Sequence, residues 1–397
     1  MQPKENRLNR AIIFGAGNIG RSFIGNIFSS NGWKVIFVDA NAALVKELNL
    51  KKEYRIIIKI NHKPDEELLV KNIEAIHSSE TDKIIELLTE CTLCATSVGQ
   101  NALPKVIPLI AEGIKIRKRQ SAPPLDIIIA ENIRNGADYF RKLFKENGLP
   151  GDEAGLIETS IGKMVPIMSE DDLRKDNLVL HAEEYNTLIL DRKGFKNRVP
   201  GFPEIKAVEN IAAWVDRKLF IHNLGHAASA YLGFKKYPDR KLISEVLEDD
   251  QLKLQVRKAM SEAAAALLCE YQDDFTLQDL TEHTEELLIR FQNKALGDSV
   301  FRVGRDLSRK LGRDDRIIGA ARLCLKHSLP CDGIINIFYA ALGFKAVDHN
   351  GIVYSKDEEF KAGFLNMGVE QALRNLCGLN PVGDRELIRV ILEADND

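Results

Sequence analysis

The sequence predicts an N-terminal α/β domain with a mostly parallel, doubly wound sheet, followed by a mainly α-helical C-terminal domain. From residue 11 to about residue 144, short β-branched runs alternate with amphipathic stretches, the pattern that consecutive βαβ units produce. A glycine-rich turn directly follows the first of these runs. Beyond Ile205, long stretches such as residues 242–271 and 277–293 carry apolar residues at three- and four-residue spacing, which indicates helices.

Four apolar runs are expected to form strands that are buried on both faces of the sheet. These runs are residues 11–14, 34–38, 93–97 and 126–130. Residues 178–190 are expected to add further strands, and the turn formers of residues 198–203 mark the expected domain junction. We therefore place the first domain at residues 1–200 and the second at residues 201–397.

Composition and charge argue against several classes of protein. The 397 residues include 55 basic and 58 acidic side chains, whereas a nucleic-acid-binding protein normally carries a basic excess. The N-terminus runs through charged residues without the apolar segment of a signal peptide. The longest nearly apolar run, residues 333–344, is too short to cross a bilayer and predicts a buried helix. We expect a soluble cytoplasmic protein with neither nucleic-acid nor membrane partners.

Two further clusters are interpreted as structural rather than functional. Cys91 and Cys94 have redox spacing, but they begin an apolar run, so we expect a buried pair of reduced thiols. A short basic cluster before Pro123 is likewise interpreted as a solvated loop rather than as a binding patch. The basic cluster expected to lie in a solvated loop comprises Lys115, Arg117, Lys118 and Arg119.

The glycine-rich turn has the spacing of a dinucleotide-binding fingerprint. Gly15, Gly17 and Gly20 follow a strand and open a predicted helix. They would allow a sharp turn, close approach of a pyrophosphate and close packing of the helix on the sheet, with the pyrophosphate at the helix N-terminus. These features predict a Rossmann domain. The alternative is that the glycines only build a tight turn.

An acidic residue determines which cofactor is expected. Asp39 ends the second strand, 19 residues after Gly20, where a carboxylate can accept hydrogen bonds from ribose hydroxyls. A 2′-phosphate would be repelled there, so the sequence predicts NAD rather than NADP, unless Asp39 only caps the next helix. A second turn follows the third predicted strand at the same sheet edge. The expected cofactor-binding residues are Gly15, Ala16, Gly17, Asn18, Ile19, Gly20, Asp39, Ser97, Val98 and Gly99.

A candidate proton acceptor lies in the second half of the chain. Removing a hydride from an alcohol carbon requires the hydroxyl proton to leave as well. Lys218, Asn223 and His226 interrupt a helix-like apolar run and fall within an arc of about 140° at 100° per residue. Burial would lower the pKa of the lysine, an amide can donate to a developing alkoxide, and a histidine can orient a hydroxyl. On spacing alone, a partly solvated helix edge remains the alternative.

These three residues also carry a family resemblance. The pattern Lys218-x4-Asn223-x2-His226 resembles the signature of the polyol-specific long-chain dehydrogenases. Residues 217–233 are similar to the mannitol-1-phosphate 5-dehydrogenase branch of that family. Further similarity comes from residues 15–21, from Arg290 with Asn293, and from residues 303–316. These blocks extend from residue 11 to about residue 325, so the resemblance covers most of the chain.

The resemblance implies a zinc-independent oxidoreductase in which Lys218 is the catalytic base. It selects His226 rather than the neighbouring His222 as the active-site histidine. It also maps a second active-site asparagine to Asn132, which with Asn223 would form an oxyanion site. Lys310 matches a substrate-contacting lysine of the wider family. The structural alternatives are that Asn132 is a helix cap and that Lys310 is a surface cation.

The substrate is expected to carry a phosphate. Residues 302–316 are densely basic although the whole protein is slightly acidic, and guanidinium groups bind phosphate oxygens bidentately. Arg305 is the first candidate, because by resemblance the enzymes that act on free mannitol carry an apolar residue there. Arg309 is a second candidate. The alternative is a solvated helix face whose charges are paired with neighbouring aspartates.

We therefore predict reversible oxidation of D-mannitol 1-phosphate to D-fructose 6-phosphate with NAD. One alternative is the same chemistry on an unphosphorylated polyol or a uronate, as in mannitol 2-dehydrogenase or tagaturonate and fructuronate reductases. The other alternative is an NAD-binding module without catalysis. The expected partner is a small sugar or polyol phosphate, and the chain is expected to be a monomer or a weak dimer.

Overall fold

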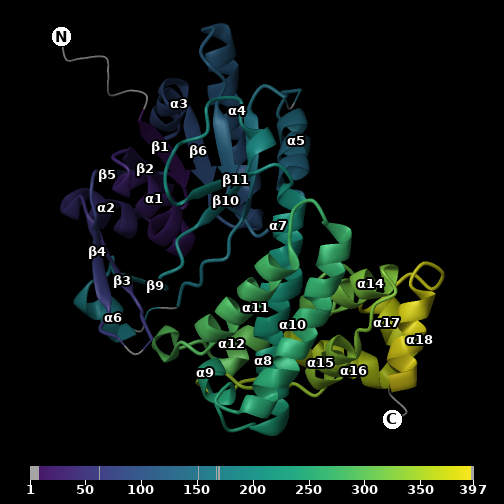
Figure 1. Cartoon of the computed structure of the whole chain (residues 1–397). Coiled ribbons are helices and arrows are strands. Elements are labelled where there is room, and N and C mark those ends of the chain that lie inside the picture. Colours follow the sequence, from purple (N-terminus) through teal and green to yellow (C-terminus); the bar gives the residue numbers. More distant parts are fainter. Residues whose placement is uncertain (1–8, 62, 151, 167, 169, 395–397) are drawn as a thin grey trace. The chain divides into compact units, whose positions relative to one another are not determined.

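The chain divides into two compact units, which follow one another in sequence at Ile211 and Ala212 (Figure 1). The computed structural model describes residues 9–61, 63–150, 152–166, 168 and 170–394. The first unit is α/β and the second is helical. The predicted fold class is therefore confirmed.

The first unit is built on an eight-stranded sheet with the order β11-β10-β8-β7-β6-β1-β2-β5. All neighbouring strands are parallel except β10 and β8, which are antiparallel. The four predicted strands correspond to β1, β2, β6 and β7, which are adjacent in the sheet, so their prediction is confirmed. The strands are β1 (Arg10–Phe14), β2 (Lys34–Asp39), β5 (Ile73–His77), β6 (Leu93–Thr96), β7 (Asp126–Ile129), β8 (Gly155–Ser160), β10 (Leu188–Asp191) and β11 (Ile205–Val208).

Helices cover both faces of this sheet, which explains why its central strands are continuously apolar. On β1, Ile13 belongs to one buried core together with Phe23, whereas Ile12 belongs to a second core together with Phe140. The first core is covered by η2 (Gly20–Gly25), α1 (Asn26–Ser30) and α2 (Ala42–Lys51). The second is covered by α3 (Thr81–Glu90), α4 (Leu103–Arg119) and α5 (Gly136–Glu146) (Figure 1).

A second, three-stranded sheet with the order β4-β3-β9 belongs to the same unit. Its strands are β3 (Tyr54–Ile58), β4 (Glu66–Val70) and β9 (Leu180–Ala182), and the short helix α6 is Glu170–Lys175. The hydroxyl of Tyr54 donates to the backbone carbonyl of Arg21 at 2.7 Å, which ties this sheet to η2. The strands expected within residues 178–190 are present as β9 and β10, whereas β3 and β4 were not predicted.

One prediction in the first unit is wrong. The basic residues 115–119 do not form a loop, because α4 continues to Arg119. Arg117 is buried, and its guanidinium donates to backbone carbonyls at the end of α3 and to that of Pro123. An arginine that satisfies buried carbonyls has a structural role that charge patterning alone does not reveal. The expected burial of Cys91 and Cys94 is confirmed.

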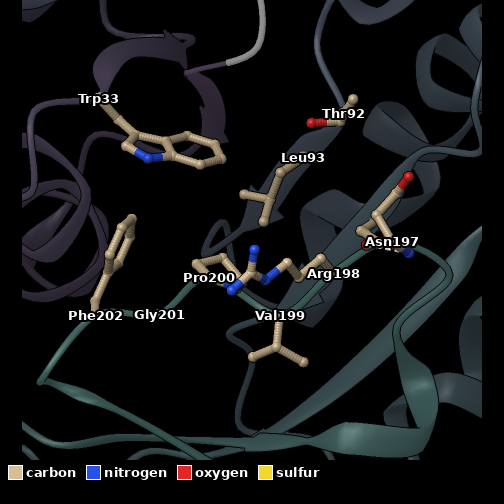
Figure 2. A pocket seen from close by; sticks show the side chains of 10 residues that line it. Trp33, Thr92, Leu93, Asn197, Arg198, Val199, Pro200, Gly201 and Phe202 are labelled. Atoms are coloured by element: carbon tan, nitrogen blue, oxygen red, sulfur yellow. Dashed lines mark hydrogen bonds between the residues drawn. The ribbon is translucent and has the colours of Figure 1, made fainter.

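A pocket of about 290 Å³ opens at the amino edge of the large sheet (Figure 2). Leu93 and Asp126, the first residues of β6 and β7, contribute to its lining. Figure 2 shows the rings of Trp33 and Phe202 on one side of the pocket and the side chain of Arg198 extending toward them. The glycine-rich turn follows the last residue of β1, so this pocket lies at the opposite sheet edge from the predicted cofactor site.

The second unit is an assembly of helices around α10 (Asp250–Glu270) (Figure 1). This helix packs against α8 (Leu224–Lys236), α11 (Leu277–Phe291), α14 (Ile318–Lys326) and α15 (Asp332–Leu342). A Cβ on Gly225 would collide with Met260, so glycine allows α8 and α10 to approach closely. The remaining helices are α7 (Ile211–Arg217), η5 (Lys218–Asn223), α9 (Ile243–Val246), α12 (Val300–Gly304), α13 (Leu307–Lys310), α16 (Ser355–Met367), α17 (Val369–Asn375) and α18 (Arg385–Ala394).

The apolar run at residues 333–344 lies largely within α15 and is mostly buried, as predicted. Across the described ranges, none of the helices combines the length and the hydropathy that a bilayer span requires.

Candidate active site

The glycine-rich turn joins β1 to the helical segment η2. Gly15 has a φ of +95°, and a Cβ on it would lie 2.5 Å from the backbone oxygen of Ser97. A Cβ on Gly20 would collide with the backbone oxygen of Gly15. Both positions therefore require glycine for the turn itself. A Cβ on Gly17 would meet no atom within 4 Å, so open space borders the turn at this point.

Asp39 lies beside this turn at the carboxyl end of β2. Its Oδ2 accepts a hydrogen bond from the backbone N–H of Ala16 at 2.7 Å, and its Oδ1 accepts one from the N–H of Asn41 at 2.8 Å. The N-cap of α2 is Asn41, whose side chain accepts from the N–H of Leu44. The interpretation of Asp39 as only a helix cap is therefore wrong.

Arg21 holds the glycine-rich turn from the inside of the protein. It is buried, and its Nε donates to the backbone oxygen of Ala16 at 2.7 Å while its Nη1 donates to that of Leu178 at 2.7 Å. Burial lowers the pKa of this guanidinium, and the nearby Asp39 carboxylate opposes that effect. The turn is thus fixed by side chains on both of its flanks.

The second turn of the expected cofactor site is held by Glu131, a residue that the sequence analysis did not single out. Its Oε1 accepts from the N–H of Val98 and its Oε2 from the N–H of Gly99, both at 2.9 Å. Burial raises the pKa of Glu131, and these two hydrogen bonds oppose that rise. The hydroxyl of Ser97 donates to the backbone oxygen of Gly15 at 3.2 Å. The structure therefore brings the two predicted cofactor-binding turns together.

Asn132 directly follows Glu131, after the end of β7, and its side chain is exposed. Helix α5 begins only at Gly136, with Asn135 at the N-cap position. The interpretation of Asn132 as a helix cap is therefore wrong. Its predicted role in an oxyanion site stays a prediction.

Lys218 and Asn223 are the first and last residues of η5, a π-helical segment between α7 and α8. In a π-helix the hydrogen bonds run between residues five positions apart, so these two residues lie one turn apart on the same side. The wider π-turn aligns Lys218 and Asn223 better than the 3.6 residues per turn of an α-helix would. Asn223 is half-buried, and its amide has no hydrogen-bond partner within the described part of the chain.

Lys218 lies in positive surroundings within the second unit. Burial, followed by the charges of Arg316 and Arg309, lowers the pKa of Lys218 to about 8, although Asp315 opposes the shift. A Cβ on Gly319 would lie 2.9 Å from the ring of Phe220, so glycine lets the start of α14 pack against η5. A lysine with this pKa can release and recover a proton near neutral pH.

His226 lies on α8, and its ring is stacked on Phe291 with a centroid distance of 4.8 Å and an interplanar angle of 5°. Its Nε2 lies 3.1 Å from Oδ2 of Asp298. The other carboxylate oxygen of Asp298 pairs with Arg302. The rival His222 is buried, and burial lowers its pKa well below the ordinary value. Asp298 was not singled out from the sequence.

The arginines of residues 302–316 differ in their partners. Arg309 pairs with Asp306 at 2.6 Å, and three others also have carboxylate partners. Within the described ranges, Arg305 alone among these arginines has no such partner. Its guanidinium is exposed and lies 5.6 Å from the ring centre of Phe301 and 5.8 Å from that of Tyr354. The alternative interpretation, a solvated helix face whose charges are paired with aspartates, therefore holds for Arg309 but not for Arg305.

Lys310 is not a surface cation. Its side chain is buried, and its ammonium group donates to the backbone carbonyl of Arg305. Burial, followed by the charges of Arg316 and Arg309, lowers the pKa of Lys310 to about 7. Lys310 thus supports the segment that carries Arg305. Its direct contact with a substrate stays a prediction.

The comparison with known proteins agrees with this architecture. Residues 9–204 match the mannitol dehydrogenase Rossmann domain, and residues 210–371 match the mannitol dehydrogenase C-terminal domain. The chain belongs to the mannitol dehydrogenase family. The family resemblance expected from the sequence is therefore confirmed.

Individual members of the mannitol dehydrogenase family match nearly the whole chain. This chain is 32% identical over 392 residues to the mannitol-1-phosphate 5-dehydrogenase of Buchnera aphidicola subsp. Acyrthosiphon pisum (strain APS). The match covers 97% of both chains. It is also 32% identical over 390 residues to the mannitol-1-phosphate 5-dehydrogenase of Brevibacillus brevis (strain 47), and this match covers 96% of both chains. The Pseudomonas fluorescens mannitol 2-dehydrogenase, solved as a ternary complex with NAD and D-mannitol, matches with a TM-score of 0.73 at 15% identity, covering 98% of this chain and 91% of that one. At 15% sequence identity, this structural similarity shows that the two proteins share a fold and no more.

In this member of the mannitol dehydrogenase family, sequence reasoning missed Glu131 and Asp298. Glu131 acts on backbone groups 32 and 33 residues away, and Asp298, which lies before α12, is close to a histidine of α8. Neither carboxylate stands in a local motif. The only sequence signal is the position of Glu131 next to Asn132, which places it at the carboxyl edge of the sheet.

Proposed function

We propose that this protein interconverts D-mannitol 1-phosphate and D-fructose 6-phosphate with NAD as the redox cofactor. The observation that carries the proposal is the pair formed by Lys218 and Asn223, a lysine with a pKa of about 8 one π-turn from an amide without a partner in the described chain. Relatives that bear the name of this activity match nearly the whole chain.

The glycine-rich turn fits a dinucleotide. The open space beside Gly17 leaves room for a pyrophosphate against the backbone, and Asp39 stands where it can accept hydrogen bonds from ribose hydroxyls. When bound, the oxidised cofactor takes up a hydride and the reduced cofactor supplies one. Glu131 and Arg21 hold the surrounding backbone in place.

Lys218 moves the proton of the reaction. In the oxidation direction, the neutral amine accepts the hydroxyl proton while the carbon loses its hydride, and the O–H electron pair becomes the second bond of the carbonyl. In the reduction direction, the ammonium form returns a proton to the oxygen. The Asn223 amide donates a hydrogen bond to that oxygen as its negative charge develops. His226 orients a substrate hydroxyl.

Arg305 is proposed to hold the substrate phosphate. Its guanidinium is exposed and has no carboxylate partner within the described ranges, so a phosphate would not have to displace an aspartate. Arg309 already pairs with Asp306 and remains the second candidate. This arrangement favours a phosphorylated substrate over a free polyol or a uronate.

Steady-state assays test the substrate assignment. We expect NADH oxidation with fructose 6-phosphate and NAD reduction with mannitol 1-phosphate, at far higher kcat/KM than with fructose and mannitol. Arg305→Ala should raise KM for the phosphorylated substrates by about 10- to 100-fold, the loss expected for a hydrogen bond to a charged group. Arg313→Ala, which removes an arginine that pairs with Asp384, serves as the matched control and should leave KM unchanged.

Two outcomes of these assays would contradict the proposal. Equal efficiency on free and phosphorylated sugars would favour the unphosphorylated alternative. Failure of every sugar phosphate, polyol and uronate to change NADH absorbance would favour an NAD-binding module without catalysis.

We further propose that the protein is cytoplasmic, works as a monomer or weak dimer and has no nucleic-acid partner. The near balance of 55 basic and 58 acidic residues supports the last point. Sedimentation velocity over a range of concentrations tests the oligomeric state, and a stable tetramer would contradict it.

A further inference from the structure

His77 lies at the carboxyl end of β5, beside Asp39 at the carboxyl end of β2. The two residues are register partners in this parallel strand pair. The backbone N–H of Ser78 donates to the carbonyl of Asp39 at 2.9 Å. The N–H of His77 donates to Oε1 of Glu80 at 3.1 Å, and its carbonyl accepts from the N–H of Glu80 at 2.9 Å. The His77 side chain therefore extends from a fixed strand end next to the expected ribose site.

Both ring nitrogens of His77 have hydrogen-bond partners. Nε2 lies 3.0 Å from the carbonyl oxygen of Ala40, and Nδ1 lies 2.7 Å from the hydroxyl oxygen of Ser79. A carbonyl oxygen has no proton to give, so Nε2 is the donor in the first bond. In the neutral ring, Nδ1 then carries the lone pair and accepts from the Ser79 hydroxyl. Turning the ring over would place carbon atoms at both positions, so these bonds select one ring orientation.

The carbonyl that His77 binds belongs to the same peptide unit as an N–H that Asp39 binds. Ala40 supplies the carbonyl of this unit, and Asn41 supplies its N–H, which donates to Oδ1 of Asp39 at 2.8 Å. A trans peptide unit is planar, and its carbonyl and N–H point in opposite directions. Holding the carbonyl on His77 therefore also directs the N–H toward Asp39. Rotation of this peptide unit would break both bonds at once.

The Asp39 carboxylate is held in a way that leaves acceptor capacity on both oxygens. Oδ1 accepts from the N–H of Asn41, and Oδ2 accepts from the N–H of Ala16 at 2.7 Å. Each carboxylate oxygen has two lone-pair sites, so one site on each oxygen remains for the two neighbouring hydroxyls of a ribose. A 2′-phosphate would instead meet the negative charge of Asp39, and the Asn41 N–H would already be engaged.

We propose that His77 is a positioning residue for cofactor selection, which holds the peptide unit between Ala40 and Asn41 so that Asp39 accepts from the ribose of NAD. Without the imidazole ring, this peptide unit can rotate. Rotation would release the carboxylate from its position and make the Asn41 N–H available to a 2′-phosphate. The inference rests on the NAD part of the proposed function and does not depend on the sugar substrate.

Fluorescence titrations with NADH and with NADPH test this role without any sugar present. His77→Leu removes one neutral hydrogen bond from the loop, so the Kd for NADH should rise by about three- to tenfold. The Kd for NADPH should stay the same or fall. A purely structural role of His77 would instead raise both Kd values by the same factor, and that result would overturn the proposal.

His77→Gln is the conservative variant. The amide nitrogen of glutamine is as many bonds from Cβ as Nε2 of histidine is, so it can donate to the Ala40 carbonyl. The Kd for NADH should therefore stay close to that of the unmodified protein. A loss as large as that of His77→Leu would overturn the proposal, because the hydrogen bond to Ala40 would then not be the cause.

A double-mutant cycle tests whether His77 acts through Asp39. Asp39→Ala removes the expected ribose contact, so adding His77→Leu to it should weaken NADH binding no further. Multiplying effects of the two substitutions would show that His77 acts by another route and overturn the proposal.

His327→Leu is the matched control. Nε2 of His327, in the second unit, also has a hydrogen-bond partner, Oε2 of Glu270 at 2.7 Å. Its removal should leave both Kd values unchanged. If His77→Leu does not fold, Ser79→Ala removes the hydroxyl partner of Nδ1 and should raise the Kd for NADH but not that for NADPH. Unchanged Kd values in Ser79→Ala would then overturn the proposal.

The failure of this inference can be distinguished from the failure of the proposed function. An unmodified protein that binds NADH but turns over no sugar phosphate would contradict the proposed substrate, while the titrations of the His77 variants would keep their meaning. An unmodified protein that binds no NADH would contradict both.

Discussion

The carboxylate of Glu131 accepts a hydrogen bond from the backbone N–H of Gly99 at 2.9 Å and so connects the ends of two neighbouring strands. Its second oxygen holds Val98 in the same way. We predict that Glu131→Gln weakens NADH binding, because an amide can accept only one of these N–H groups and must place its NH₂ against the other. Fluorescence titration with NADH measures the change, and we expect Kd to rise by about fivefold or more.

Glu131→Gln should also lower the free energy of unfolding of the first unit by about 1–3 kcal/mol, the cost of leaving a buried donor unsatisfied. Glu262→Gln is a matched control in the second unit, where Glu262 accepts from the N–H groups of Gly333 and Ile334. This control should lose similar stability and retain the original Kd for NADH. Equal effects of both variants on Kd would contradict a local role of Glu131.

The glycines of the fingerprint should respond differently to the same substitution. Gly17→Ala places a methyl group in open space, so the melting temperature should stay unchanged. The Kd for NADH should rise, because the methyl group occupies the space expected for the pyrophosphate. Gly20→Ala places it against the backbone oxygen of Gly15, so the fold itself should be destabilised. Calorimetry and NADH titration of both variants check this contrast. A Gly17→Ala protein with unchanged NADH affinity would argue against a cofactor at this turn.

Catalysis should depend on pH through Lys218, whose pKa is lowered to about 8. Oxidation of mannitol 1-phosphate requires the neutral amine, so kcat/KM should rise about tenfold per pH unit below that value and level off above it. Reduction of fructose 6-phosphate requires the ammonium form, so its rate should fall as pH rises through the same value. Burial is the main cause of this lowered pKa, the charges of Arg316 and Arg309 add to it, and the charge of Asp315 opposes it.

Lys310 provides the control for this assignment, because its pKa is lowered to about 7. Lys310→Met should retain the inflection near the pKa of Lys218. Loss of that inflection in Lys310→Met would show that Lys310, rather than Lys218, is the titrating group.

The sequence revealed those features of the fold that repeat locally. The glycine spacing and the apolar runs around Phe14 and Asp39 were enough to predict the centre of the parallel sheet, because period and turn chemistry are set within a few residues. β4 was missed because four of its five residues are exposed, so it lacks the alternation of a half-buried strand. β3 pairs with β4 but also with β9, which comes more than 100 residues later. Register between such distant strands leaves no local pattern.

The candidate site was predictable where its residues share a helix. Lys218, Asn223 and His226 follow one another closely, although the π-turn that aligns the first two was not predicted, since a single extra residue per turn leaves little trace in periodicity. Asp298 and Glu131 could not be found in this way. Each acts on groups that only the tertiary fold brings near, and buried partners of this kind are specified by packing rather than by sequence spacing.

The central claim is that Lys218 is the proton-transferring base of an NAD-dependent sugar-phosphate dehydrogenase, and Lys218→Met tests it most directly. We predict that kcat for fructose 6-phosphate reduction falls by about 10²- to 10⁴-fold, the usual contribution of a general acid or base. The Kd for NADH and the melting temperature should stay close to those of the unmodified protein. A Lys218→Met protein that retains kcat within about tenfold of the original would contradict the account.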